Sequence, residues 1–136
     1  MADKPLFIGA YRNVGTIRTN ANTTASQVIF TADATNGSRV HAINIYSDDT
    51  ASQTARLILN DGSTDTELYT VTVPAQAGDL DATNPISLLN ETKLDILDAS
   101  PGRFLTLGAG DSLKIATTGT VTASKSMKVS VFAGDY

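Results

Sequence analysis

The sequence predicts an all-β protein, an antiparallel β-sandwich or jelly roll of seven or eight short strands. Three observations support this prediction: short segments alternate between apolar and polar residues, turn residues separate them, and threonine is the commonest residue. Alternation with a period of two is typical of strands, because successive side chains leave a pleated backbone on opposite faces. β-Branched residues such as threonine also favour pleated surfaces over long helices.

The clearest strands lie in the middle of the chain. Residues 40–46 and 55–60 both alternate cleanly, so that the odd-numbered residues of the first segment, His41 among them, are expected to share one face. The polar residues 47–53 between these segments cannot bury their backbone and must turn in solvent. We therefore expect a central antiparallel hairpin, against which the rest of the chain packs.

Two further elements are expected before this hairpin. Residues 6–17 hold two short apolar pieces, and Gly9 and Gly15 suggest a bend or a bulge, so residues 1–20 are expected to form an N-terminal arm or an edge strand. Residues 27–31 alternate and predict a short strand, and an Asn-Gly turn at residues 36–37 leads from it into the hairpin.

After the hairpin, residues 66–73 alternate again and are expected to pair antiparallel with residues 55–60, until Pro74 ends the strand. The segment 86–98 is ambiguous, because its apolar spacing fits one short helix or an extended segment equally. Further short strands are predicted at residues 104–107, 112–117 and 127–132.

Length and composition limit the possibilities. The 136 residues are predicted to form a single domain, 1–136, with an ordinary core and no disulfide, since the chain has no cysteine. No apolar run approaches the roughly 20 residues that a membrane-spanning helix needs, and the N-terminal residues do not resemble a signal peptide. A net charge of −4 argues against a nucleic-acid partner, which requires a basic face. We expect no membrane and no nucleic acid among the partners.

The charge is unevenly placed along the chain. Acidic residues far outnumber basic residues between Asp48 and Asp111, whereas most of the lysines and arginines lie in the two flanks. Two explanations remain open: an ordinary solvated surface, or a two-sided charge distribution that steers docking on a partner.

No residues suggest catalysis. The only histidine, His41, lies inside a predicted strand, and with no cysteine it is the only candidate base for a nucleophilic triad. One histidine with scattered carboxylates is not a ligand set for zinc. Asp61 and Asp65 lie in a run that resembles a calcium loop, although aspartate is also a favoured turn residue. We expect no enzyme activity and no cofactor, with a loop calcium ion near Asp61 and Asp65 as the alternative.

The order of three motifs resembles that of the small β-sandwich virion proteins of tailed bacteriophages, found as head decoration (cement) proteins and in tail or fibre attachments. An R-V-x-x-I-x-I-x-(S/N) strand is followed by a strand that ends in an Asp-Gly turn and, later, by an L-x-A-G-D-S-L turn. The residues that match are Arg39, Val40, Ile43, Ile45 and Ser47, then Leu57, Leu59, Asp61 and Gly62, then Leu107, Ala109, Gly110, Asp111, Ser112 and Leu113. The similarity runs from Val28 to Phe132, and residues 74–103 are unmatched.

This resemblance implies a non-enzymatic structural protein of the virion, assembled in the host cytoplasm. It implies a capsid decoration protein that binds the head lattice, with the major capsid protein or another virion lattice protein as its partner. A homo-oligomer is expected, with a trimer favoured. The candidate lattice or subunit contacts are Leu6, Phe7, Ile8, Tyr11 and Arg12. The alternative is a tail- or fibre-associated β module for attachment or host-surface carbohydrate binding, using the loops 47–53 and 75–84.

Overall fold

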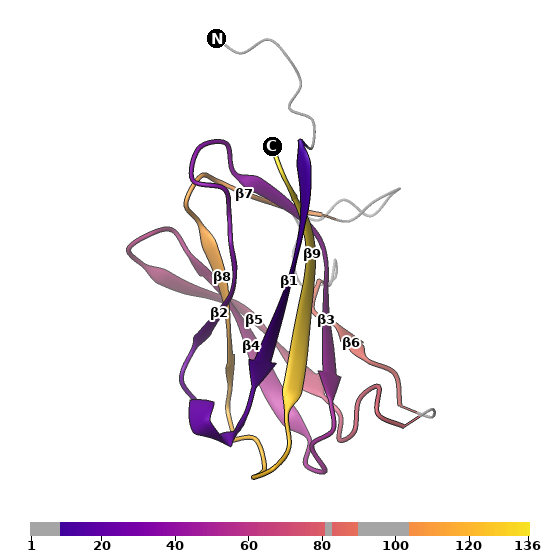
Figure 1. Cartoon of the computed structure of the whole chain (residues 1–136). Helices are drawn as coiled ribbons and strands as arrows, with labels where there is room; N and C mark the ends of the chain where they lie inside the picture. The colour runs from indigo at the N-terminus through magenta and orange to yellow at the C-terminus, as the bar shows by residue number, and fades with distance from the viewer. Residues whose placement is uncertain (1–8, 81–82, 90–103) are drawn as a thin grey trace.

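The computed structural model describes residues 9–80, 83–89 and 104–136, which form two antiparallel β-sheets packed face to face (Figure 1). The first sheet contains β1 (Ala10–Arg18), β9 (Met127–Asp135), β3 (Ser38–Ser47) and β6 (Ile86–Ser87) in this order, and β7 (Leu105–Leu107) also pairs with β3. The second sheet contains β2 (Gln27–Thr31), β8 (Ser112–Thr117), β4 (Gln53–Asn60) and β5 (Asp65–Val73) in this order. The predicted all-β sandwich is confirmed.

The strand pairing is nested. The first strand pairs with the last, β1 with β9; inside that pair lie β2 with β8, then β3 with β6, and finally β4 with β5. Nested pairs divided between two sheets in this way are the jelly-roll arrangement, to which β7 is an addition beside β3. A single 3₁₀ turn, η1 (Asn20–Asn22), is the only helical element within the described residues.

The predicted central hairpin is wrong in its pairing. Both of its strands form where the alternation predicted them, but β3 belongs to the first sheet and β4 to the second. The residues between them cross from one sheet to the other. The period of two identifies a strand with one apolar face, but two such strands bury that face equally well side by side or across a sandwich. The predicted pairing of β5 with β4 is confirmed.

Register shifts of one residue decide which side chains enter the core. In β3 the shift against β9 lies between Val40 and Ala42, so His41 is the extra residue and is exposed. Val40, Ile43 and Ile45 are all buried as a result. The strict alternation expected for residues 40–46, which would have placed Val40 opposite Ile43, is therefore wrong at this bulge.

A register shift of one residue also occurs in β2, where it lies between Val28 and Phe30 in the pairing with β8. Because Ile29 is the extra residue, Ile29 and Phe30 are both buried although they are consecutive. By contrast, Gly15 lies in a continuous register between β1 and β9, so the bulge expected there does not form.

The ambiguous segment 86–98 begins as a strand. Ile86 and Ser87 form β6, and the next two residues, Leu88 and Leu89, are buried. The short helix considered for this segment would fall on residues 90–98, which lie outside the described residues. Residues 1–8 of the expected N-terminal arm or edge strand, 1–20, also fall outside them, because the described chain begins at Gly9. From Ala10 to Arg18 the chain is β1, at an edge of the first sheet.

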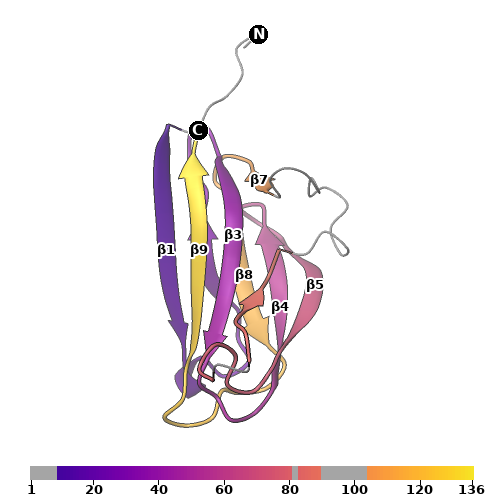
Figure 2. The same cartoon turned by 90° about the vertical axis from the view of Figure 1, so that its right-hand side faces the viewer.

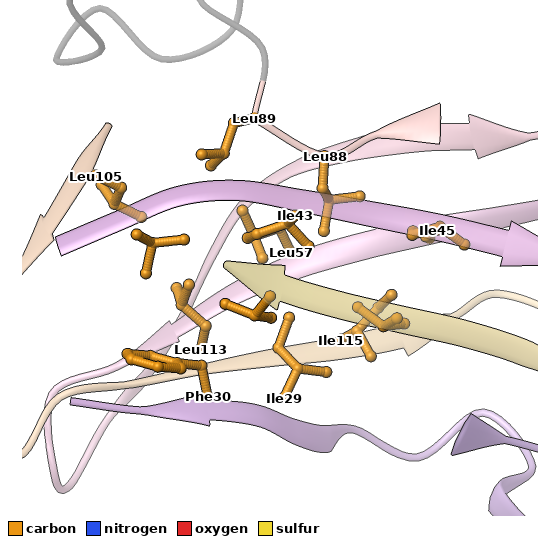
Figure 3. Close-up of a cluster of buried hydrophobic side chains, with 14 of the residues drawn as sticks. Ile29, Phe30, Ile43, Ile45, Leu57, Leu88, Leu89, Leu105, Leu113 and Ile115 are labelled. Carbon is orange, nitrogen blue, oxygen red and sulfur yellow. The ribbon is translucent and has the colours of Figure 1, made fainter. Parts of the chain in front are cut away.

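The core fills the space between the two sheets with aliphatic side chains and Phe30. Ile43 and Ile45 of β3 face Leu57 of β4 and Leu113 and Ile115 of β8 (Figure 3). Each of these side chains is fully buried, which stabilises the fold by about 1.5–3 kcal/mol per residue relative to exposure. Burial of the inner faces is thus what holds the sheets together.

Arg18 closes the sandwich at the edge where β1 and β2 meet. This arginine is fully buried; Nη2 donates to the carbonyls of Thr23 at 3.0 Å and Ala25 at 2.8 Å, and Nε donates to the Thr117 hydroxyl at 3.2 Å. Burial, followed by the nearby charge of Arg56, lowers the pKa of Arg18. Neutral oxygens from the second sheet and the 19–26 loop therefore hold this end of β1.

Candidate interaction surface

Five residues at the N-terminus are the predicted contacts, and the structure describes two of them. Leu6, Phe7 and Ile8 lie outside the described residues. Tyr11 and Arg12 are neighbours in β1, so their side chains leave the sheet on opposite sides. Tyr11 points outward and is 84% exposed. Arg12 points toward the inner side, and the two residues therefore have different environments.

Arg12 is held by a cluster within the protein. Its Nε donates to Asp135 Oδ2 at 3.0 Å and its Nη2 to Asp135 Oδ1 at 2.8 Å, and Nη2 also reaches the carbonyl of Thr31 at 2.6 Å. The guanidinium lies 4.4 Å from the centre of the Phe30 ring, and the Ser38 hydroxyl donates to the same carboxylate. The cluster joins β1 to β9, β3 and β2, so a lattice contact by Arg12, which stays a prediction, would have to compete with these bonds.

The charge of this cluster is stabilised locally. The hydrogen bonds from Arg12, with further help from Ser38, lower the pKa of the Asp135 carboxyl. Both side chains keep some exposure, 36% for Arg12 and 21% for Asp135. A bidentate arginine–carboxylate pair fixes the relative position of two strands more firmly than a single ion pair does.

Strands β1, β9 and β3 lie side by side (Figure 2), and their outward positions form a surface of four residue rows. Paired residues in an antiparallel sheet share a face, and the alternate residues of β9 are buried in the core, so the remaining positions face outward. We call this surface the first-sheet face. Its rows are Tyr11–Gly134–Arg39, Asn13–Phe132–Ala42, Gly15–Ser130–Asn44 and Ile17–Lys128–Tyr46.

The four rows of the first-sheet face combine exposed apolar groups with cations and include no acidic residue, although Asp79 borders them and accepts a hydrogen bond from the Tyr46 hydroxyl at 2.7 Å. Tyr11, Ile17 at 58% and Phe132 at 41% are three of the five large hydrophobic residues that are exposed in the described part of the chain. Its two charged residues lie in the two end rows and are both basic, although the protein as a whole is acidic. Such a composition, aromatic and poor in carboxylates, is typical of the centre of protein–protein interfaces.

Aromatic rings hold both cations in place. The ammonium of Lys128 lies 5.4 Å from the centre of the Tyr46 ring. The guanidinium of Arg39 lies 4.2 Å from the Phe104 ring centre, and its Nε donates to the Tyr136 hydroxyl at 3.1 Å. Neither contact neutralises the charge, so a partner that brings a carboxylate to this face would meet cations whose positions are already restricted.

The outer side of the second sheet, which we call the second-sheet face, has a different chemistry. Its charged residues form ion pairs with each other: Lys114 with Asp65 at 3.0 Å, and Arg56 with Glu67 at 3.4 Å. Val28 is the only large hydrophobic residue exposed on it among the described residues. Charges that are paired in this way are typical of a surface that faces solvent.

The carboxylates considered for calcium have partners within their own turn. Asp61 accepts hydrogen bonds from the backbone of Thr64 at 2.8 Å and of Ser63 at 3.1 Å, and these bonds, Thr64 first, lower the pKa of Asp61. Asp65 accepts from Asn60 at 2.6 Å and pairs with Lys114. Within the described residues, no group of three or more acidic residues or histidines is arranged to hold a metal ion.

Asp49 is a buried carboxylate whose role the sequence did not reveal. It accepts hydrogen bonds from the Thr122 hydroxyl at 2.6 Å, the Thr122 amide at 3.0 Å, the Ala51 amide at 3.0 Å and Gln53 Nε2 at 3.2 Å. Burial by itself would raise the pKa of Asp49, but these bonds outweigh it and lower the pKa. Asp49 therefore joins two loops, 48–52 and 118–126, each of which crosses between the sheets.

The described residues enclose no pocket, and none of their helical segments is long and apolar enough to cross a membrane. His41, the only histidine of the chain, is exposed at the β3 bulge. Burial, followed by the charge of Arg39, lowers its pKa. The site that the geometry offers is thus a surface, the first-sheet face.

Comparison with known proteins identifies the fold. No protein-family model matches the sequence, and no curated protein matches it. A chain in the acidic stable capsid structure of Helicobacter pylori bacteriophage KHP30 is similar, with a TM-score of 0.61 and 8% identity over 94% of this chain and 90% of that chain. A chain in the capsid asymmetric unit of cyanophage Pam1 is similar with a TM-score of 0.51 and 21% identity, over 100% of this chain and 92% of that chain. At these identities the likeness concerns the fold.

Proposed function

We propose that the protein is a non-enzymatic structural protein of a bacteriophage virion, and specifically a decoration protein that binds and stabilises the head lattice. The observation that carries this proposal is the match to a chain of the phage KHP30 capsid structure, which covers nearly the whole of both chains. The similarity to the Pam1 capsid chain supports it with a second phage. Both come from comparison of structures, whereas the resemblance to small virion proteins rests on sequence motifs, so the two arguments are separate.

The architecture supports a role exercised through contact. A decoration protein needs no cavity for a substrate; it needs an exposed surface and a fold that withstands assembly. The first-sheet face supplies exposed Tyr11, Ile17 and Phe132 on a continuous sheet. In this proposal the partner is the major capsid protein or another lattice protein, and the protein acts as a homo-oligomer, a trimer in the favoured case. Of the proposed N-terminal contacts, Tyr11 and Arg12 lie within the described residues.

Immunogold electron microscopy tests the proposal directly. An antibody raised against this chain is applied to particles purified from a lysate of the phage whose genome encodes it. Regular label over the heads is the expected result. Label confined to the tail would replace the decoration role by the tail or fibre role, and particles without label would overturn a virion role altogether.

A further inference from the structure

We infer that two copies of this protein join through the edge of the first sheet, where β1 of one copy pairs antiparallel with β1 of the other around Val14. This inference goes beyond the proposed function, because it names a contact between copies and holds whether or not the protein decorates a head. Three observations carry it: no described strand covers one side of β1, that side has no protection against strand addition, and β1 is complementary to itself in one register.

β1 lies at the end of the first sheet, and among the described residues no strand pairs with its far side, which we call the free edge (Figure 2). Every second residue of an edge strand directs both of its backbone groups away from the partner strand. The carbonyl of Ile17 points to the free edge, where Nε2 of Gln27 donates to it at 3.2 Å. Tyr11, Asn13 and Gly15 follow the same alternation, so their amides and carbonyls can bind a further strand.

The other sheet edges of the described chain carry the usual protection against strand addition, which is a short strand, a bulge or charged side chains. β2 has five residues and a register shift, and β6 and β7 have two and three residues. β5 is as long as β1, but a register shift interrupts its pairing with β4 and its outer side carries Asp65 and Glu67. β1 has nine residues in continuous register with β9, without proline, lysine or a carboxylate.

One register makes β1 complementary to itself. When two copies pair around Val14, Tyr11 of each copy lies opposite Ile17 of the other, and Asn13 lies opposite Gly15. These are the residues whose backbone groups point to the free edge, and the Ile17 carbonyl can accept a second hydrogen bond beside that from Gln27. Tyr11 is 84% and Ile17 is 58% exposed, and an aromatic residue opposite a β-branched one is a favourable cross-strand pair.

The arginines argue against the neighbouring registers. Pairing around Arg12 would place this residue opposite its own copy, and pairing around Gly15 would place Arg12 opposite Arg18. Like charges directly opposite each other destabilise a sheet. Around Val14 both arginines lie opposite small uncharged residues, Thr16 and Ala10, and keep their bonds within the protein.

Two registers remain to be compared. A pairing around Asn13 would place Ile17 opposite Gly9, which has no side chain to cover it. A pairing shifted by a single residue would continue the outer side chains of one copy with the inner side chains of the other. The register around Val14 is therefore the one that covers apolar side chains, separates the arginines and preserves both faces of the sheet.

The symmetry of this contact decides in favour of a second copy. Pairing of β1 with a different edge, such as β5 of the next copy, would continue head-to-tail into a ring or an open chain, whereas β1 against β1 is satisfied by two copies. A two-fold contact requires an even number of chains. The oligomer would be a dimer, or a hexamer if the three-fold contact of the favoured trimer forms as well.

Light scattering after gel filtration measures the number of chains in the full-length wild type and in two variants of one residue. Gly15→Pro removes an amide that points to the free edge and leaves the ladder with β9 intact, whereas Gly15→Ala keeps that amide. The wild type and Gly15→Ala are expected to contain an even number of chains, and Gly15→Pro half that number. Thermal unfolding verifies that both variants fold.

The masses also separate this inference from the proposed function. A wild type of one chain or of three chains would overturn the two-fold contact and leave the virion role to the immunogold experiment. Equal masses for folded Gly15→Pro and Gly15→Ala would overturn the contact as well. Absence of label on the particles would overturn the virion role and leave the contact between copies standing.

A single introduced cysteine tests the register, because the chain has no cysteine of its own. Val14→Cys places two thiols opposite each other on the two-fold axis, in a pair without mutual backbone hydrogen bonds, where Cα atoms lie about 4.5 Å apart and a disulfide can form. Asn13→Cys is the matched control, since this position is more exposed but lies opposite Gly15 of the second copy. Under mild oxidation Val14→Cys is expected to give at least tenfold more covalent dimer than Asn13→Cys. Equal cross-linking at the two positions, or more at position 13, would contradict the inference even if Gly15→Pro does not fold.

Discussion

The two outer faces of the sandwich are built on the same scaffold but differ in how their charges are satisfied. On the second-sheet face, Lys114 and Arg56 each have a carboxylate partner in β5. On the first-sheet face, Lys128 and Arg39 lie over aromatic rings beside exposed Tyr11 and Phe132, and neither forms an ion pair within the described residues. The charges of the second-sheet face are thus paired within the protein, whereas the first-sheet face exposes large apolar side chains beside its cations.

The largest expected effect separates the inner side of the first sheet from its outer side. Ile43→Ala removes a fully buried side chain of β3 and is expected to lower the free energy of unfolding by about 2–5 kcal/mol, because it leaves a cavity in the core. Asn44→Ala, at the next position on the outer face, is expected to change it by less than about 0.5 kcal/mol. Urea denaturation of both variants measures this difference. Equal losses would mean that the first-sheet face contributes to stability and not only to contact.

The second prediction compares one carboxylate of each sheet. Asp135→Asn removes the negative charge and one of the two oxygens that accept the bidentate bond from Arg12, and it is expected to cost about 1–3 kcal/mol of unfolding free energy. Glu67→Gln breaks the more exposed pair with Arg56 and is expected to cost about 0–1 kcal/mol. The same denaturation measurement decides between them. A greater loss for Glu67→Gln would show that the second-sheet pairs are structural and would weaken the contrast between the faces.

The third prediction concerns pH. The pKa of Asp49 and that of Asp135 are lowered in the folded protein from an ordinary value of 3.8, so the unfolded chain takes up protons first as the pH falls. Their contribution to stability is therefore complete above about pH 4 and is lost progressively as the pH falls through the folded values. Thermal unfolding between pH 7 and pH 2 checks this course. Asp49→Asn is expected to reduce the stability at pH 7 and to flatten the curve, and an unchanged slope in that variant would contradict the assignment.

The smallest expected effect has the opposite sign. Gly15→Ala fills open space on the first-sheet face and removes backbone freedom from the unfolded chain, so it is expected to raise the unfolding free energy by about 0.5–1 kcal/mol. The control is Gly37→Ala. Gly37 has a φ of 79°, and a Cβ there would collide with the carbonyl of Leu107, so this change is expected to destabilise the protein. A loss of stability in Gly15→Ala would mean that this position of β1 requires glycine for a reason internal to the fold.

The sequence predicted the strands far better than it predicted their partners. Local alternation located β2, β3, β4, β5, β8 and β9 within a few residues, because the period of two depends only on neighbours in the chain. Among the pairings, that of β4 with β5 was predicted correctly, since a short turn joins these strands. The pairing of β1 with β9 joins residues more than a hundred positions apart, and no local pattern encodes it.

The candidate surface, too, was predicted from the sequence only in part. The sequence alone showed that Tyr11 belongs to an apolar N-terminal piece and that the basic residues lie in the flanks of the chain. It did not show that Arg12 turns inward to Asp135. Nor did it show that Tyr11, Phe132 and Tyr46 share one face, because that face combines β1, β9 and β3, which are far apart in the sequence. The bulge at His41 also determines this surface, since it shifts by one residue which side chains of β3 face outward. Local alternation and turn chemistry thus determined the elements, whereas the long-range pairing of β9 between β1 and β3 decided the surface, because a face exists only once its strands lie side by side.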